Sequence, residues 1–125
     1  MQITASAISL NVADPQASAR FLIDHLGFTE QLAADGFVSL ARADAGMNVI
    51  YLRTGLATFK PARIAGSAGE GVLVVFTVAD IDAEYARLRG EGVPIETAIE
   101  TEEWGERYFQ MTDPNGVVIQ LVQWV

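Results

Sequence analysis

The sequence predicts an α+β fold made of two βαβββ modules, each a strand, a helix and three further strands. The main observation is an internal repeat, because Val12-Ala13-Asp14 recurs as Val78-Ala79-Asp80, 66 residues later. Each copy follows a short apolar run and precedes apolar residues at helical spacing. We expect a single domain with module 1 at about residues 1–54, a linker at about 55–71 and module 2 at about 72–125.

In the first module, the half-apolar run Ala7–Val12 suits a buried strand. Asp14 is placed as a helix N-cap and Pro15 fills the first helical position, where proline is best tolerated. The helix ends at Gly27, a residue type that favours helix C-termini. Three strands are predicted to follow, over Thr29–Leu32, Phe37–Arg42 and Met47–Arg53.

The second module repeats this order, with a strand over Val72–Val78 and a helix that starts after Asp80 and ends near Gly90–Gly92. Turn-forming residues fill 43–46 and 113–116, where hairpins are expected. The intervening segment, 54–71, is rich in Gly, Ala, Ser and Pro and is interpreted as a flexible connector. The predicted strands are Ile95–Ile99, Arg107–Thr112 and Val117–Trp124.

Composition narrows the function classes. The chain has 125 residues, 16 acidic and 8 basic residues, a formal charge of -8 and no cysteine. This charge disfavours nucleic acid and membrane surfaces as partners, and the missing cysteine excludes thiolate sites and disulfides. No secretion signal or membrane-length apolar run is visible, so we expect a cytoplasmic protein. A small molecule, or another protein, is the expected partner.

Two segments resemble the vicinal oxygen chelate superfamily, which includes glyoxalase I, extradiol dioxygenases and bleomycin-resistance proteins. "ISLNVADPQASARFLIDHLGF" looks like the family's opening strand and helix, and "DPNGVVIQLVQW" looks like its closing turn and strand. The resemblance implies paired βαβββ modules whose strands form a cupped mixed sheet with the helices outside, commonly in a homodimer. It also implies a divalent metal held by His and Glu in the enzymes.

The positions that would hold this metal are occupied by poor ligands. The resemblance places the opening-strand ligands at Ala7 and Leu73 and the final ligand at Gln120, whose amide is a weak neutral ligand. The equivalent in the first module is Ile50 or Tyr51. The only histidine, His25, is expected at a helix end. We therefore predict no metal, no cofactor and no catalytic residue, although metal-free acid–base chemistry stays open. The candidates for such chemistry are Tyr51, Tyr108 and Glu106.

Strand pairing predicts which side chains face the cup. With Thr112 opposite Val117, Phe109 lies opposite Gln120. If Gln120 points into the cup, Phe109, Met111, Val118 and Trp124 share its face, and Arg107 lies near the mouth. Val117, Ile119 and Leu121 would then lie under the helices. A shift of one residue would reverse these assignments.

Trp104, on a loop before Gly105, suits stacking on a flat ligand, and packing at an edge or a subunit interface is an equal alternative. The surrounding run of glutamates is either a solvated rim or a site that favours cations. Residues 66–125 hold 11 acidic and 3 basic residues, whereas residues 1–65 hold 5 of each, so the excess charge lies in the second module.

The sequence thus predicts a metal-independent binding protein that resembles the bleomycin-resistance branch. It would sequester a hydrophobic or planar compound such as an antibiotic, with a cationic one permitted. The alternatives are a lyase, isomerase or dioxygenase of the same superfamily, and an interaction module with a closed cup. The predicted ligand-binding residues are Trp104, Phe109, Gln120, Arg107, Met111, Tyr51, Phe37 and Phe59.

Overall fold

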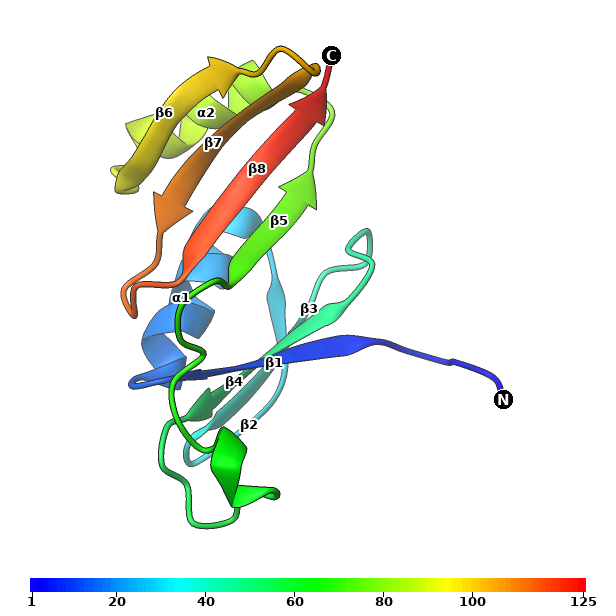
Figure 1. Cartoon of the computed structure of the whole chain (residues 1–125), viewed down its shortest axis with the longest axis vertical. Coiled ribbons are helices and arrows are strands. Elements are labelled where there is room, and N and C mark those ends of the chain that lie inside the picture. Colours follow the sequence, from blue (N-terminus) through cyan, green and yellow to red (C-terminus); the bar gives the residue numbers. More distant parts are fainter. The chain divides into compact units, whose positions relative to one another are not determined.

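The computed structural model describes residues 1–125 and contains two compact units, Met1–Glu70 and Gly71–Val125. Each unit has the order strand, helix, three strands, so the predicted repeat is confirmed. In each unit, a four-stranded mixed sheet carries its helix on one face (Figure 1). No helix is both long and apolar enough to cross a membrane.

In unit 1 the strand order is β1-β4-β3-β2, with β1 parallel to β4 and the other pairs antiparallel. Alternate residues of β3 and β4 are buried, among them Val38, Leu40 and Val49, and the apolar side of α1 packs on this face. The other face carries both polar and apolar side chains, among them Ser9, Asn11 and Leu52. The elements are β1 (Ala7–Val12), α1 (Pro15–Leu26), β2 (Thr29–Ala34), β3 (Phe37–Ala41), β4 (Asn48–Arg53) and η1 (Ala62–Ile64).

The ends of α1 follow the local signals in the sequence. The Asp14 side chain accepts a hydrogen bond from the N–H of Ala17 at 3.2 Å, and Pro15 occupies the first turn. Gly27 ends the helix with φ 69°, the left-handed conformation that glycine adopts without steric cost. The predicted bounds of α1 are confirmed.

Unit 2 has the strand order β5-β8-β7-β6 and the same pattern of parallel and antiparallel pairs. Asp80 caps α2 by accepting from the N–H of Ala83 at 3.1 Å. Ile119 and Leu121 are buried on the helix-covered face, as predicted. The elements are β5 (Leu73–Thr77), α2 (Ile81–Gly90), β6 (Ile95–Thr101), β7 (Glu106–Thr112) and β8 (Val118–Trp124).

The predicted register of the last hairpin is wrong by one residue. Thr112 pairs with Val118 rather than Val117. Val117 instead closes the turn, because its carbonyl accepts from the N–H of Asp113 and its own N–H donates to the Asp113 carboxylate, both at 2.9 Å. The loop therefore contains three residues and ends at Gly116, whose φ of 82° suits such hairpins. A one-residue shift exchanges the two faces of a strand.

In the observed register, Phe109 pairs with Leu121 and Met111 pairs with Ile119. Both side chains are fully buried on the helix-covered face, and the Phe109 ring meets Tyr85 of α2 edge-on at 4.9 Å between centroids. Gln120 pairs with Gln110 on the opposite face. The predicted association of Phe109 and Met111 with Gln120 on one face is therefore wrong.

Candidate functional site

Gln120 lies at the centre of a hydrogen-bond chain on the face of the unit 2 sheet that α2 does not cover. In each unit, the face without the helix is called the uncovered face. Its amide N–H donates to Glu106 Oε1 at 2.9 Å, and its carbonyl oxygen accepts from Gln110 Nε2 at 2.9 Å. The chain continues because Gln110 Oε1 accepts from the Thr97 hydroxyl at 2.7 Å. Gln120 is only 5% exposed, and both the nitrogen and the oxygen of its amide are hydrogen-bonded within the protein.

These residues do not fit the divalent metal that the resemblance implies. The two opening-strand positions, Ala7 and Leu73, carry hydrocarbon side chains, and the Gln120 amide is bonded to its neighbours. His25 lies on α1 with its ring against Phe21, 5.1 Å between centroids. No group of three or more His, Cys, Asp and Glu side chains is placed to hold a metal ion.

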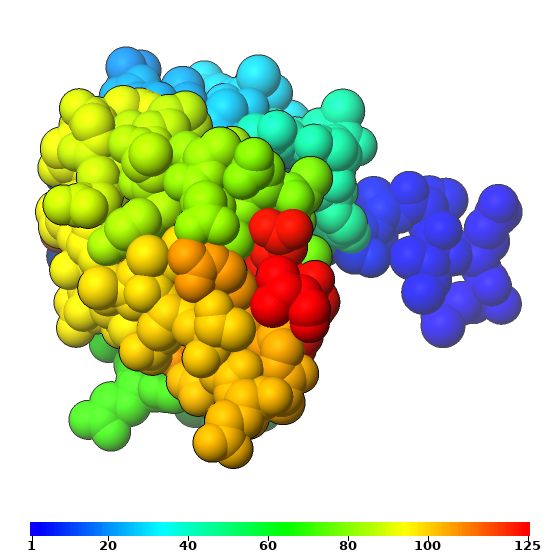
Figure 2. Space-filling view, turned by 90° about the horizontal axis from the view of Figure 1, so that it is seen from above, coloured from blue at the N-terminus to red at the C-terminus, as the bar shows by residue number.

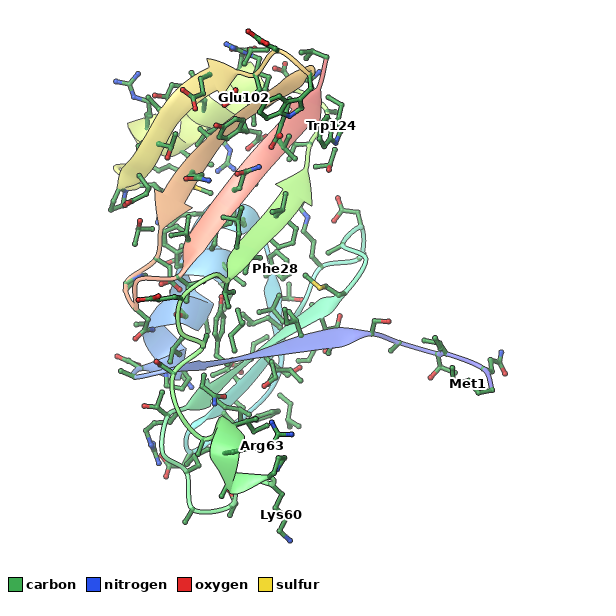
Figure 3. All side chains as sticks on the ribbon, in the orientation of Figure 1. Met1, Phe28, Lys60, Arg63, Glu102 and Trp124 are labelled. Atoms are coloured by element: carbon green, nitrogen blue, oxygen red, sulfur yellow. The ribbon has the colours of Figure 1, made fainter.

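Trp104 is 67% exposed and held in place. Its indole N–H donates to Glu106 Oε2 at 2.8 Å, and the following Gly105 accepts from the N–H of Val125 at 2.8 Å. Figure 2 shows the C-terminal residues in red beside the orange segment that follows β6, and Figure 3 labels Trp124 at the end of β8. The Glu106 carboxylate therefore joins the exposed indole of Trp104 to the hydrogen-bond chain around Gln120.

Four other predicted contacts lie elsewhere. Arg107 projects toward α2, where its guanidinium donates to Asp82 at 2.6 Å and to Thr101 at 2.8 Å, rather than lying at the mouth of a cup. Tyr51 is 1% exposed on the helix-covered face of unit 1. Phe109 is 0% exposed and offers no ring to a ligand. Met111, also 0% exposed, is equally inaccessible.

Part of the acidic segment is engaged by Tyr108. The Tyr108 hydroxyl lies 2.6 Å from Glu100 Oε1 and 2.8 Å from Glu102 Oε1. These hydrogen bonds to carboxylates, with a smaller contribution from burial, raise the pKa of Tyr108 well above its usual range. The phenol therefore remains protonated near neutral pH and is poorly suited to act as a general base.

Unit 1 contains a pocket of about 700 Å³ on the uncovered side of its sheet. Its floor comes from β1 and β4, and its wall comes from the segment 56–68, which was predicted to be a flexible connector. The lining residues combine apolar, hydroxyl, amide and basic side chains: Ser9, Asn11, Leu52, Leu56, Thr58, Phe59, Lys60, Arg63, Ile64, Gly66, Ser67 and Ala68.

Asn11 ties this segment to the sheet. Its side-chain amide donates to the carbonyl oxygens of Ile64 and Gly66 at 2.6 and 2.8 Å. Two backbone bonds add to this attachment, from Ala68 N–H to Asn11 O at 3.0 Å and from Gly55 N–H to Ala65 O at 2.7 Å. The segment therefore packs as part of unit 1, in contrast to the predicted free connector.

Of the eight predicted ligand-binding residues, Phe59 lines this pocket. Phe37 lies beside it, since it is paired directly opposite Leu52 and so shares the face of that lining residue. Asn11 was not predicted as a site residue, although a polar residue between the apolar Leu10 and Val12 marks the uncovered side of β1. Lys60 and Arg63 were missed because they lie in the predicted linker.

Comparisons with known proteins agree with the fold. A solved structure of a glyoxalase/bleomycin resistance protein/dioxygenase from Nocardioides aligns with a TM-score of 0.81 at 23% identity, covering 100% of this chain and 85% of that one. TioX from Micromonospora sp. ML1 aligns with a TM-score of 0.77 at 20% identity, covering 98% and 100%. TnmS3, an antibiotic binding protein from Streptomyces sp. CB03234, aligns with a TM-score of 0.74 at 25% identity, covering 100% and 99%.

Among curated proteins, an uncharacterised protein of Mycobacterium bovis is 40% identical over 48 residues. That match covers 38% of this chain and 32% of the relative, so it spans about a third of that protein's length. The family model described as the Glyoxalase/Bleomycin resistance protein/Dioxygenase superfamily matches residues 4–121. With the paired βαβββ modules, this match shows that the chain belongs to the glyoxalase/bleomycin resistance protein/dioxygenase superfamily.

Proposed function

We propose that this protein binds a small organic molecule in the pocket of unit 1 and sequesters it without a metal ion. The observation that carries the proposal is the pocket itself. Its volume of about 700 Å³ lies within the usual range for small-molecule sites, roughly 300–1,000 Å³. Its lining of apolar surface with a few hydroxyl and amide groups is also typical of such sites.

The similarity to TnmS3, an antibiotic binding protein, supports the same class of ligand. We therefore include planar antibiotics among the first compounds to test, with resistance by sequestration as the biological role. The proposal also includes a homodimer and a cytoplasmic location. Light scattering of the purified protein and fractionation of cells check these two points.

Chemical-shift mapping of backbone amides tests the proposal. A binding compound should shift the amides of β1 and of residues 54–68 in a saturable way. Replacing Ser9 with Trp fills the floor of the pocket from an exposed strand position, so this variant should lose binding. Ala7→Trp is the matched control, because Ala7 is exposed on the same side of β1 and is not a lining residue.

A second candidate site is the uncovered face of unit 2, which the exposed and anchored Trp104 favours. The two sites are separable because both tryptophans, Trp104 and Trp124, lie in unit 2. Quenching of tryptophan fluorescence that Trp104→Ala abolishes, without shifts in unit 1, would place binding on that face and contradict the unit 1 proposal. If the Ser9→Trp variant binds as tightly as the wild-type protein, that result would also contradict the unit 1 proposal.

A further inference from the structure

The pocket gathers the two unpaired basic side chains of unit 1. The other three arginines of this unit each pair with an aspartate: Arg20 with Asp24 at 3.3 Å, Arg42 with Asp44 at 2.6 Å and Arg53 with Asp35 at 3.0 Å. Lys60 and Arg63 have no such partner, and both line the pocket. Figure 3 shows them extending from the segment that contains η1.

No carboxylate is among the lining residues, although the whole chain carries a formal charge of -8. The Asn11 amide is occupied by two backbone carbonyls, which leaves the hydroxyls of Ser9, Thr58 and Ser67 as neutral polar groups. The pocket therefore has positive charge without a negative group to balance it, in a protein that is otherwise acidic.

Apolar side chains form the remaining surface. Leu52 comes from β4, whereas Leu56, Phe59 and Ile64 come from the segment around η1. Phe59 is half-buried, so part of its ring remains available to a ligand. Apolar and basic groups thus lie around the same pocket, which suits a molecule with an apolar body and an anionic end.

We propose that the ligand of this pocket is an amphipathic organic anion, in which a carboxylate, sulfonate or phosphate is attached to a flat or apolar body. The apolar body lies against Phe59 and the leucines, and the anionic group lies near Arg63 and Lys60. Guanidinium and ammonium groups both bind such anions through charge-assisted hydrogen bonds. This inference rests on the proposed function and reverses the charge expected from the acidic second module.

Three probes with the same ring test the assignment: naphthoate, naphthamide and naphthylmethylammonium. Affinities come from amide shifts of unit 1, or from calorimetry. Because both cations are exposed and screened by solvent, we expect naphthoate to bind about three- to tenfold more tightly than naphthamide. The naphthylmethylammonium ion should bind most weakly. Raising the salt concentration should narrow these differences.

In the double variant Lys60→Gln, Arg63→Gln, the ratio of naphthoate affinity to naphthamide affinity should fall to about one. Arg20→Gln is the matched control, since it removes one positive charge from an exposed residue outside the lining and should retain the preference. Equal binding of the anion and the amide by the wild-type protein would overturn the inference, as would a preference that survives the double variant. If no probe binds unit 1 saturably, the proposed function itself fails.

Discussion

Removing the Asn11 side chain should release the segment that walls the pocket. Asn11→Ala deletes the donors of two hydrogen bonds, to the carbonyls of Ile64 at 2.6 Å and Gly66 at 2.8 Å. Each bond of this kind contributes about 0.5–1.5 kcal/mol net. Since Asn11 is only half-buried, we expect the lower part of the combined range, about 1–2 kcal/mol. The loss should favour local opening of residues 54–68 rather than global unfolding.

Amide hydrogen exchange measures this opening. The N–H groups of Gly55 and Ala68 are bonded to carbonyls at 2.7 and 3.0 Å, so they report whether the segment is closed. A change of 1–2 kcal/mol corresponds to exchange that is about five- to thirtyfold faster. The Val78 N–H, bonded to Val122 O at 2.8 Å in unit 2, should be unaffected. Affinity for any pocket ligand should fall in the same variant.

Asn48→Ala is the matched control, because Asn48 donates one side-chain bond, to Gln31 at 3.2 Å, away from the segment. If the Gly55 and Ala68 amides exchange no faster in Asn11→Ala than in this control, Asn11 does not hold the wall. Asn11→Asp keeps the shape but directs a carboxylate at the carbonyl oxygens, so it should also open the segment. If the Gly55 and Ala68 amides exchange as slowly in Asn11→Asp as in the wild-type protein, the Asn11 amide does not hold the segment through its N–H donors.

Three further outcomes follow from the structure. Phe109→Ala should lower the free energy of unfolding by about 3–5 kcal/mol in urea titrations, because it leaves a cavity in the core; a loss below about 1 kcal/mol would contradict its burial. Asp113→Ala should lower the free energy of unfolding by about 1–3 kcal/mol in the same assay, because it removes the acceptor of two N–H bonds at 2.9 Å. Asp113→Asn keeps an acceptor oxygen and should retain most of the stability. Ultraviolet titration should find that Tyr108 ionises above the ordinary tyrosine pKa, because hydrogen bonds to two carboxylates raise its pKa in the folded state. The stability that these bonds contribute is fully present below the ordinary tyrosine pKa. It is lost as the pH rises through the raised pKa of the folded state. Replacing Glu100 and Glu102 with Gln should lower that pKa, and an unchanged titration would contradict the assigned cause.

The bounds of α1 could be predicted because their causes are local. Asp14, Pro15 and Gly27 act within a turn of the helix that they delimit, so neighbouring residues suffice to identify them. The half-apolar, β-branched run Ala7–Val12 likewise identified the strand β1. The order of elements followed from the repeat of these same signals around Asp80.

The face of β7 could not be predicted, because it depends on a single residue in a turn. Asp113 binds the N–H of Val117 with its carboxylate, which shortens the loop to three residues and shifts the register. That shift placed Phe109 and Met111 in the core rather than near a ligand. Alternative turns of similar composition differ little in energy, so composition alone does not choose between them.

Local signals in the sequence were enough to predict the two modules, the order of their elements and the helix ends, since these depend on interactions between residues close along the chain. The place of the pocket and its charge depend instead on contacts between residues far apart in the chain. Asn11 reaches residues 53 and 55 positions away, and this contact converts a predicted connector into a wall that brings Lys60 and Arg63 to the uncovered face of β1. Hydrogen bonds between such distant residues leave no periodic pattern in a sequence, so only the folded chain reveals them.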